Sequence, residues 1–209
     1  RGRIAALRQK IDLDFVLEDT RALLEETRAG IERVRKIVQD LRDFSRVDSA
    51  GQRQWADINQ SLETTLKLLG ERLADDVEIR REYGQLPQVE CDPAELNQVF
   101  FNLLNNALQA LPQGGRVTLR SGLDDARVWV EIEDNGVGIA EDALPHIFDP
   151  FFTTRPVGQG AGLGLSLAYG VVQQHQGRIS VDSMVGRGSV FRVTLPIRRS
   201  DDPAGASDG

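Results

Sequence analysis

Three short stretches in the second half of the chain are the most informative: Asn102–Ala107 reads NLLNNA, Asp134–Gly138 reads DNGVG, and Gly158–Leu165 reads GQGAGLGL. Asn102 and Asn106 are four residues apart, so on a helix both amides project from one face. Amide oxygens are hard, neutral ligands suited to Mg²⁺. Asparagines that face only solvent would give the same pattern.

The other two stretches have the composition of turns that bind a base or a phosphate. A carboxylate such as Asp134, followed by glycines, can accept a hydrogen bond from a base while the chain turns beneath it. An ordinary Asp-Asn-Gly turn would read the same. Glycines ahead of a helical pattern expose N–H groups toward phosphate, although a flexible loop without a ligand is the alternative. Arg155 is the only Lys or Arg between residues 128 and 177, so it is the candidate for a cationic phosphate contact.

Patterns around these stretches predict helices and strands in alternation. Asp92 is a suitable N-cap and Pro93 a suitable first residue for a helix that ends before Pro112. Helical spacing also predicts helices over about 58–73 and 163–175, and apolar alternation predicts strands near 77–79, 117–119, 128–132, 179–181 and 191–195. We read 122–125 as the connection between two of these strands. The prediction is an α+β fold, a two-layer α/β sandwich whose mixed sheet is covered on one side by helices.

The first part of the chain predicts a long bundle helix. From Leu13 to Ser45, spacings of four and three alternate over ten positions, seven of which are Leu, Ile or Val. Such a seam is typical of a helix with a partner. We therefore expect a homodimer that pairs through Leu17, Leu24, Ile31, Val34, Val38 and Leu41.

The composition of the chain argues against a nucleic-acid partner and indicates a reducing compartment. The net charge of −7 and a pI near 5 argue against nucleic-acid binding. Cys91 is the only cysteine, so no intrachain disulfide can form, which fits a reducing compartment. There is neither a secretion signal nor an apolar run long enough to cross a bilayer. Because the chain begins at Arg1, we expect a cytoplasmic piece of a parent protein that can itself be membrane-anchored.

The order and spacing of the three stretches, with Phe148–Phe152 (FDPFF) between them, resemble the ATP-binding domain of bacterial sensor histidine kinases over residues 90–196. The resemblance implies the histidine kinase ATPase-like fold, with ATP and Mg²⁺ as cofactors. It implies transfer of the ATP γ-phosphate to a histidine, for relay to an aspartate on the receiver domain of a response regulator.

The resemblance also implies a role for individual residues. Asn102 and Asn106 are the catalytic candidates: Asn106 ligates the Mg²⁺ that bridges the ATP phosphates, and Asn102 and Gln109 line the same site. Asp134 hydrogen-bonds the adenine N6, and Gly136 and Gly138 let the backbone lie against the ring. Phe148 belongs to a phenylalanine box that anchors a mobile lid over ATP, residues about 141–161. The remaining cofactor-binding residues implied are Ile139, Thr153, Thr154, Arg155, Gly160, Gly162, Leu163, Gly164 and Leu165.

One part of the family pattern is missing, the acceptor histidine on the first helix of a dimeric hairpin. The only histidines, His146 and His175, lie inside the ATP-binding part, and His175 is predicted to be structural. The chain should therefore bind ATP without autophosphorylating, and should act on an acceptor helix of its own parent or of a partner subunit. The predicted organisation is a partial dimerisation region at 1–46, a linker at 47–57, the ATP-binding domain at 58–197 and a tail at 198–209.

Two alternatives remain open. An ATP hydrolase of the same superfamily would place a Glu where this chain has Asn102, because the general base must take a proton from water. An amide cannot take that proton, so we rank ATP hydrolysis below histidine kinase activity as the function of this chain. A nucleotide-sensing dimerisation module without phosphate transfer is the second alternative.

Overall fold

The structure is a computed structural model, and it describes residues 15, 17–28, 30–31, 53–70, 77–111, 114–155 and 161–198. The chain divides into two compact units, residues 1–43 and 44–209. All described residues of the first unit are helical, and all but Gly30 are exposed. No helix formed by described residues combines the length and the apolar character needed to cross a membrane.

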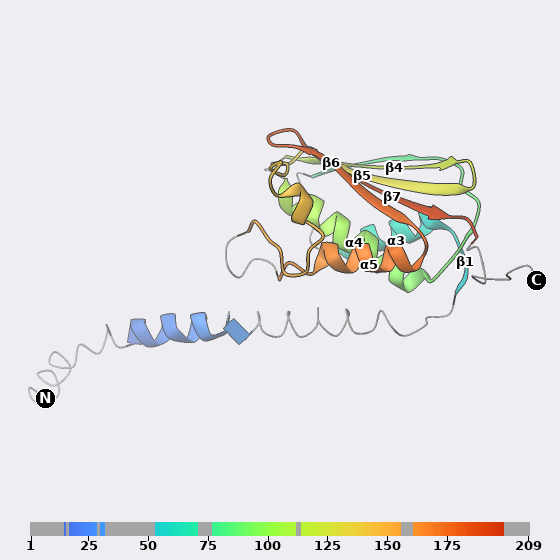
Figure 1. Cartoon of the computed structure of the whole chain (residues 1–209). Coiled ribbons are helices and arrows are strands. Elements are labelled where there is room, and N and C mark those ends of the chain that lie inside the picture. The colour runs from blue at the N-terminus through green and yellow to red at the C-terminus, as the bar shows by residue number, and fades with distance from the viewer. Residues whose placement is uncertain are drawn as a thin grey trace, which may run out of the picture. The chain divides into compact units, whose positions relative to one another are not determined.

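The second unit contains a five-stranded sheet with strand order β2-β4-β5-β7-β6 (Figure 1). β2 and β4 are parallel, whereas the other three neighbouring pairs are antiparallel, so the sheet is mixed as predicted. The strand bounds are β2 Glu78–Tyr83, β4 Arg116–Asp124, β5 Arg127–Asp134, β6 Arg178–Met184 and β7 Gly188–Pro196.

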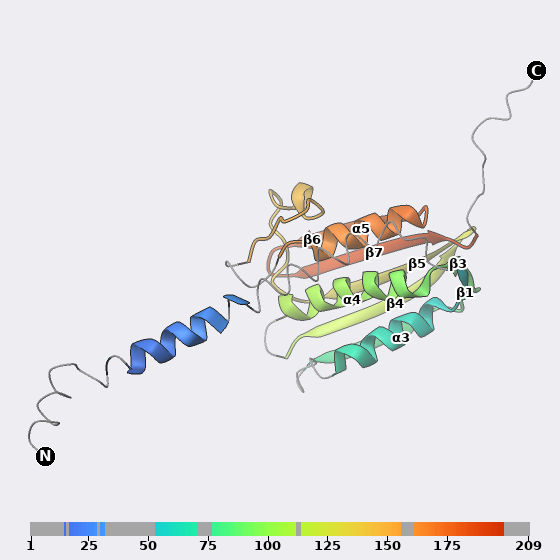
Figure 2. The ribbon, with the colours of Figure 1, turned by 90° about the horizontal axis from the view of Figure 1, so that it is seen from below.

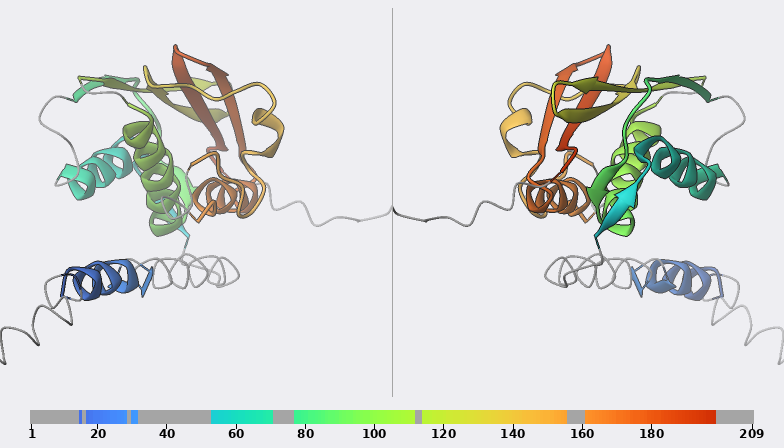
Figure 3. Two further views of the ribbon diagram at one scale, coloured as in Figure 1. Left: turned by 90° about the vertical axis from the view of Figure 1, so that its left-hand side faces the viewer. Right: turned by 90° about the vertical axis from the view of Figure 1, so that its right-hand side faces the viewer.

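Helices cover one face of this sheet, which confirms the two-layer sandwich (Figures 2 and 3). Their side chains and the inward-facing strand residues, such as Val128, Val130 and Ile132, form one buried apolar core. The helix bounds are α3 Ile58–Leu69, α4 Pro93–Ala110 and α5 Gly164–Gln174, with a short 3-10 helix η2 at Leu144–His146.

The helices begin in two different ways. Asp57 caps α3 by accepting a hydrogen bond from the Gln60 N–H at 3.1 Å. Asp92 caps α4 by accepting from the N–H groups of Ala94 and Glu95 at 2.9 and 3.3 Å, so this helix begins where Asp92-Pro93 predicted. In contrast, α5 begins without a side-chain cap, which leaves its first N–H groups available to other acceptors.

A second, two-stranded sheet pairs β1 (Gln54–Ala56) with β3 (Val89–Cys91), and neither strand was predicted. β1 falls within the stretch that we read as a linker. Contacts from the chain after β7 hold this sheet: the Glu90 N–H donates to the Ile197 carbonyl at 2.9 Å, and the Arg198 guanidinium lies 5.6 Å from the Trp55 ring centroid. Tertiary contacts therefore stabilise β1 where its local pattern gives no sign of a strand.

Two predicted boundaries differ from the structure. β4 continues to Asp124, and the connection to β5 is a two-residue turn at Asp125 and Ala126 rather than residues 122–125. Gly122 lies within the strand, beneath the ring of Trp129, where an added Cβ would come within 2.3 Å of that ring. α3 ends at Leu69, and the predicted end near residue 73 lies outside the described residues.

Candidate functional site

Asp134 is the last residue of β5, and its side chain is buried beneath the β5–η2 loop. Its Oδ1 accepts a hydrogen bond from the Gly136 N–H at 2.8 Å. Burial raises the pKa of this carboxyl above its ordinary value, although hydrogen bonds from the N–H groups of Gly136 and Ser189 oppose that rise. A buried carboxylate with unused acceptor capacity can receive a donor from a ligand such as an adenine amino group.

Gly136 and Gly138 are required by close contacts within the protein itself. A Cβ on Gly136 would lie 2.4 Å from the Ala110 carbonyl oxygen at the end of α4. Gly138 has φ +71°, and a Cβ there would lie 2.1 Å from the Met184 carbonyl oxygen. The Val137 N–H also donates to the Ala110 carbonyl at 3.0 Å. The loop is therefore fixed between α4 and the β6–β7 hairpin, which holds Asp134 in place.

Polar residues from β6 and β7 support this loop, and neither of them was among the predicted site residues. The Ser183 hydroxyl accepts from the Ile139 N–H at 2.8 Å, donates to the Gly188 carbonyl at 3.0 Å and lies 2.9 Å from the Ser189 hydroxyl. Only the strand register could have revealed these residues, because Asp134 pairs with Ser189 and Ser189 pairs with Ser183.

Asn102 of α4 lies beside the start of α5. An added Cβ on Gly164, the first residue of α5, would lie 3.7 Å from the Asn102 amide. The Nδ2 of Asn102 is buried and forms no hydrogen bond with a described residue, so this amide donor is unsatisfied within the described part of the chain. Asn106 is half-buried one turn further along α4. The uncapped N–H groups of α5 and the Asn102 amide thus form a polar corner suited to an anion.

The segment between β5 and α5 also contacts α4. The Arg155 guanidinium donates to Oε1 of Gln109, although these residues are 46 positions apart. Burial lowers the pKa of Arg155 from its ordinary value, but an arginine remains protonated at neutral pH. The structure therefore brings together the predicted phosphate cation and a predicted site residue of α4.

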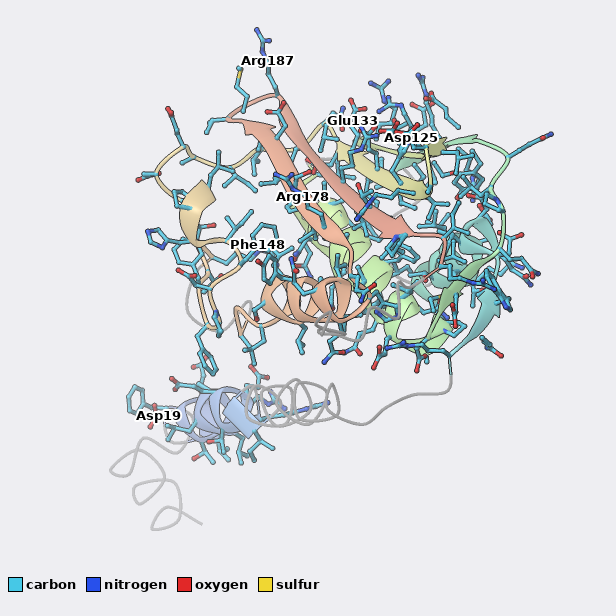
Figure 4. All side chains as sticks on the ribbon, turned by 45° about the vertical axis from the view of Figure 1, so that its right-hand side comes forward. Asp19, Asp125, Glu133, Phe148, Arg178 and Arg187 are labelled. Carbon is cyan, nitrogen blue, oxygen red and sulfur yellow. The ribbon has the colours of Figure 1, made fainter. Side chains whose placement is uncertain are left out.

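The phenylalanine box joins this segment to α5. The Phe148 and Tyr169 ring centroids are 5.4 Å apart, so Phe148 packs against α5 (Figure 4). Phe151 has φ +69° and donates its N–H to the Gly162 carbonyl at 2.9 Å. A Cβ on Gly162 would lie 2.4 Å from the Phe151 carbonyl carbon, so this glycine permits the close approach.

Of the remaining predicted site residues, two form hydrogen bonds, three are described by their burial, and one lies outside the described residues. Ile139 is placed by its N–H bond to Ser183, and the Thr153 hydroxyl accepts from the Arg155 N–H at 3.2 Å. Leu163 is buried, Leu165 is half-buried and Thr154 is exposed. Gly160 lies outside the described residues. Within the described part of the chain, no cluster of three or more His, Cys, Asp or Glu side chains could hold a metal ion.

His175 has structural contacts, as predicted. Its Nε2 accepts from the Asp92 N–H at 3.1 Å, and its Nδ1 lies 2.8 Å from the Val171 carbonyl, to which it donates. The ring therefore ties the end of α5 to the start of α4.

Comparisons with known proteins agree with this geometry. A family model described as histidine kinase-, DNA gyrase B- and HSP90-like ATPase matches residues 91–199. Sporulation kinase E of Bacillus subtilis (strain 168) is 42% identical over 117 residues, which are 55% of this chain and 15% of that protein. Sensor kinase CckA of Brucella abortus (strain 2308) is 38% identical over 186 residues, covering 79% of this chain and 20% of that one. The chain thus spans a fifth or less of the length of these two relatives.

Solved structures show the same fold. The catalytic domain of histidine kinase ThkA is 28% identical with a TM-score of 0.64, and the match covers 70% of this chain and 97% of that one. ThkA in complex with the response regulator protein TrrA is 25% identical with a TM-score of 0.68, over 80% of this chain and 48% of that one.

Proposed function

Because the chain belongs to the family of histidine kinase-, DNA gyrase B- and HSP90-like ATPases, we propose that it is the ATP-binding catalytic portion of a sensor histidine kinase. Its substrates would be ATP and a histidine on an acceptor helix of its own parent or of a partner subunit. The phosphoryl group would then pass to an aspartate on the receiver domain of a response regulator.

Two features along α4 carry the proposal: the buried carboxylate of Asp134, whose loop contacts the Ala110 carbonyl at the end of α4, and the polar corner formed by Asn102 and the start of α5. The first offers an acceptor to an adenine amino group. The second offers an unpartnered amide and uncapped N–H groups to the phosphates. Arg155, held against Gln109, adds a cation to a protein whose net charge is −7.

The amides of α4 also suit Mg²⁺, which accepts neutral oxygen ligands and retains several waters. We propose that the Asn106 Oδ1 would hold Mg²⁺ against the phosphates, where its charge would offset part of theirs. The absence of an acidic cluster among the described residues fits a metal that depends on nucleotide for ligands.

Kinase activity is favoured over ATP hydrolysis by the chemistry of Asn102. Hydrolysis needs a group that accepts a proton from the attacking water, and an amide does not. Asn102 can instead orient a phosphate by donating a hydrogen bond. We further propose that the parent protein acts as a homodimer and in the cytoplasm, where the free thiol of Cys91 would remain reduced.

Two measurements test this function. Titration calorimetry should show one ATP site per chain that weakens when Mg²⁺ is removed, and Asp134→Ala should lower the affinity by ~10–150-fold, because a hydrogen bond to a charged group contributes ~1.5–3 kcal/mol. Asp125→Ala, a substitution in the β4–β5 turn, is the control. Labelled ATP should then phosphorylate an added acceptor-hairpin domain. Release of free phosphate without labelling of that hairpin would favour the hydrolase, and neither reaction would favour a nucleotide-sensing module.

A further inference from the structure

A groove of about 690 Å³ lies at the edge of the sheet that is formed by β6, outside the candidate ATP site. It is open to solvent, and none of its lining residues is acidic. The lining residues that the argument uses are Tyr169 and Gln173 of α5, Arg178 and Ile179 of β6, Thr194 of β7 and Arg127 of β5.

The two arginines of this groove differ from four other arginines of the sheet. Arg80, Arg81, Arg120 and Arg192 each form an ion pair with a glutamate. Among the described residues, no carboxylate forms an ion pair with Arg127 or Arg178. In a chain with a net charge of −7, a groove with two uncompensated cations and no acid is complementary to an anion.

The strand register puts these two cations on opposite sides of β7, opposite two different residues of that strand. Arg178 pairs with Thr194, and Arg127 pairs with Pro196, the next residue on the same face of β7. Arg127 and Arg178 belong to strands that are separated by β7, about 10 Å apart. An anionic ligand that reaches both must therefore be extended, with negative charge at more than one point.

The shape and composition of the groove favour a peptide over a small molecule. Small-molecule sites are enclosed and mostly apolar, whereas this groove is open and mainly polar. Tyrosine and arginine are the residue types enriched at protein interfaces, and Tyr169 is 41% exposed.

We propose that this groove docks an extended acidic segment of a partner protein, whose carboxylates pair with Arg127 and Arg178. Such a contact would be separate from the ATP site.

Fluorescence anisotropy with a labelled oligoglutamate peptide tests the proposal without nucleotide, so the result does not depend on the proposed function. The peptide should bind, an oligolysine peptide of equal length should not, and affinity should fall as salt is added. The Arg127→Glu and Arg178→Glu double variant should bind at least about tenfold more weakly. A double Arg→Gln variant at the same positions should also weaken binding, with less change in net charge.

Arg187→Glu is the matched control, because Arg187 lies at the tip of the β6–β7 hairpin, away from the start of β6 (Figure 4). It should retain the wild-type affinity. Thermal unfolding of each variant would establish that it is folded. Equal weakening by Arg187→Glu would show a general charge effect and overturn the proposal, as would unchanged affinity in both double variants. Binding of an oligonucleotide or of inorganic phosphate, without binding of the acidic peptide, would also overturn it.

Discussion

Asp134 illustrates at the scale of a single residue how a binding group can oppose stability. Its carboxyl is buried with a raised pKa, so the folded protein binds this proton more tightly than the unfolded chain does. Where the folded state holds more protons, stability falls as pH rises. The contribution of Asp134 is therefore most favourable below its ordinary pKa of 3.8 and decreases as pH rises through the raised folded value.

We predict that Asp134→Asn stabilises the nucleotide-free protein at neutral pH and weakens ATP binding. The amide keeps an acceptor for the Gly136 N–H but carries no charge to bury. Chemical denaturation across a pH series should show a flatter dependence for the variant than for the wild type. Asp125→Asn in the exposed β4–β5 turn is the control, since its charge change is the same. A variant that is both less stable and weaker in binding would contradict the argument.

At the scale of elements, we predict that replacing His175 destabilises the fold and that replacing His146 does not. The His175 side chain is 8% exposed and joins α5 to α4 through two hydrogen bonds, whereas the His146 side chain is 58% exposed. His175→Ala should lower the free energy of unfolding by about 1–3 kcal/mol, because partners of a nearly buried ring are left unsatisfied. His146→Ala should change it by less than about 0.5 kcal/mol. Denaturant titration of both variants checks this, and equal effects would mean that the junction does not stabilise the fold.

The segment between β5 and α5 should become more ordered when ATP binds. Within residues 141–155 of this segment, Ala143 and Ile147 are buried, but the other side chains are exposed or half-buried. The contacts of these residues with the rest of the chain include Arg155 with Gln109, Phe148 with Tyr169, and Phe151 with Gly162. A segment whose side chains are mostly exposed or half-buried can open locally, and a ligand that touches the segment would reduce this opening. Amide exchange of residues 141–155 should therefore slow with ATP and Mg²⁺, while exchange of β5 stays unchanged. Equal exchange rates with and without ATP and Mg²⁺ would contradict the prediction that this segment is a lid.

At the scale of the whole molecule, the first unit leaves large apolar side chains in solvent. Leu17, Leu24 and Ile31 lie on the predicted seam and are 60%, 66% and 62% exposed. The other predicted pairing residues, Val34, Val38 and Leu41, lie outside the described residues. An exposed apolar seam of this kind favours association with a second helix.

We predict a homodimer that dissociates when Leu24 and Ile31 are both replaced by Asp. Light scattering should show a monomer, and ATP binding should be retained because the site residues belong to the second unit. Ala22→Asp is the control, since position 22 faces away from the seam on the same helix. A wild-type chain that stays monomeric at high concentration would refute the pairing.

The sequence alone determined those helices, strands and side-chain placements that depend only on residues close together in the chain. Asp92 and Pro93 start α4 because capping is local, and the spacing of Asn102 and Asn106 follows from the helical repeat. The apolar alternation likewise predicted a mixed sheet with helices on one face, because each pattern reports the burial of its own element.

Only the tertiary structure decided how distant segments meet. Strand pairing brings Ser183 and Ser189 to the loop after Asp134, and β1 exists because β3 pairs with it, so neither has a local signal. Arg155 reaches Gln109 and Phe148 reaches Tyr169 through packing of segments far apart in sequence. Arg127 and Arg178 lie on opposite sides of β7, opposite Pro196 and Thr194, for the same reason. Such contacts depend on register and chain reversal, which residue spacing along the chain does not encode.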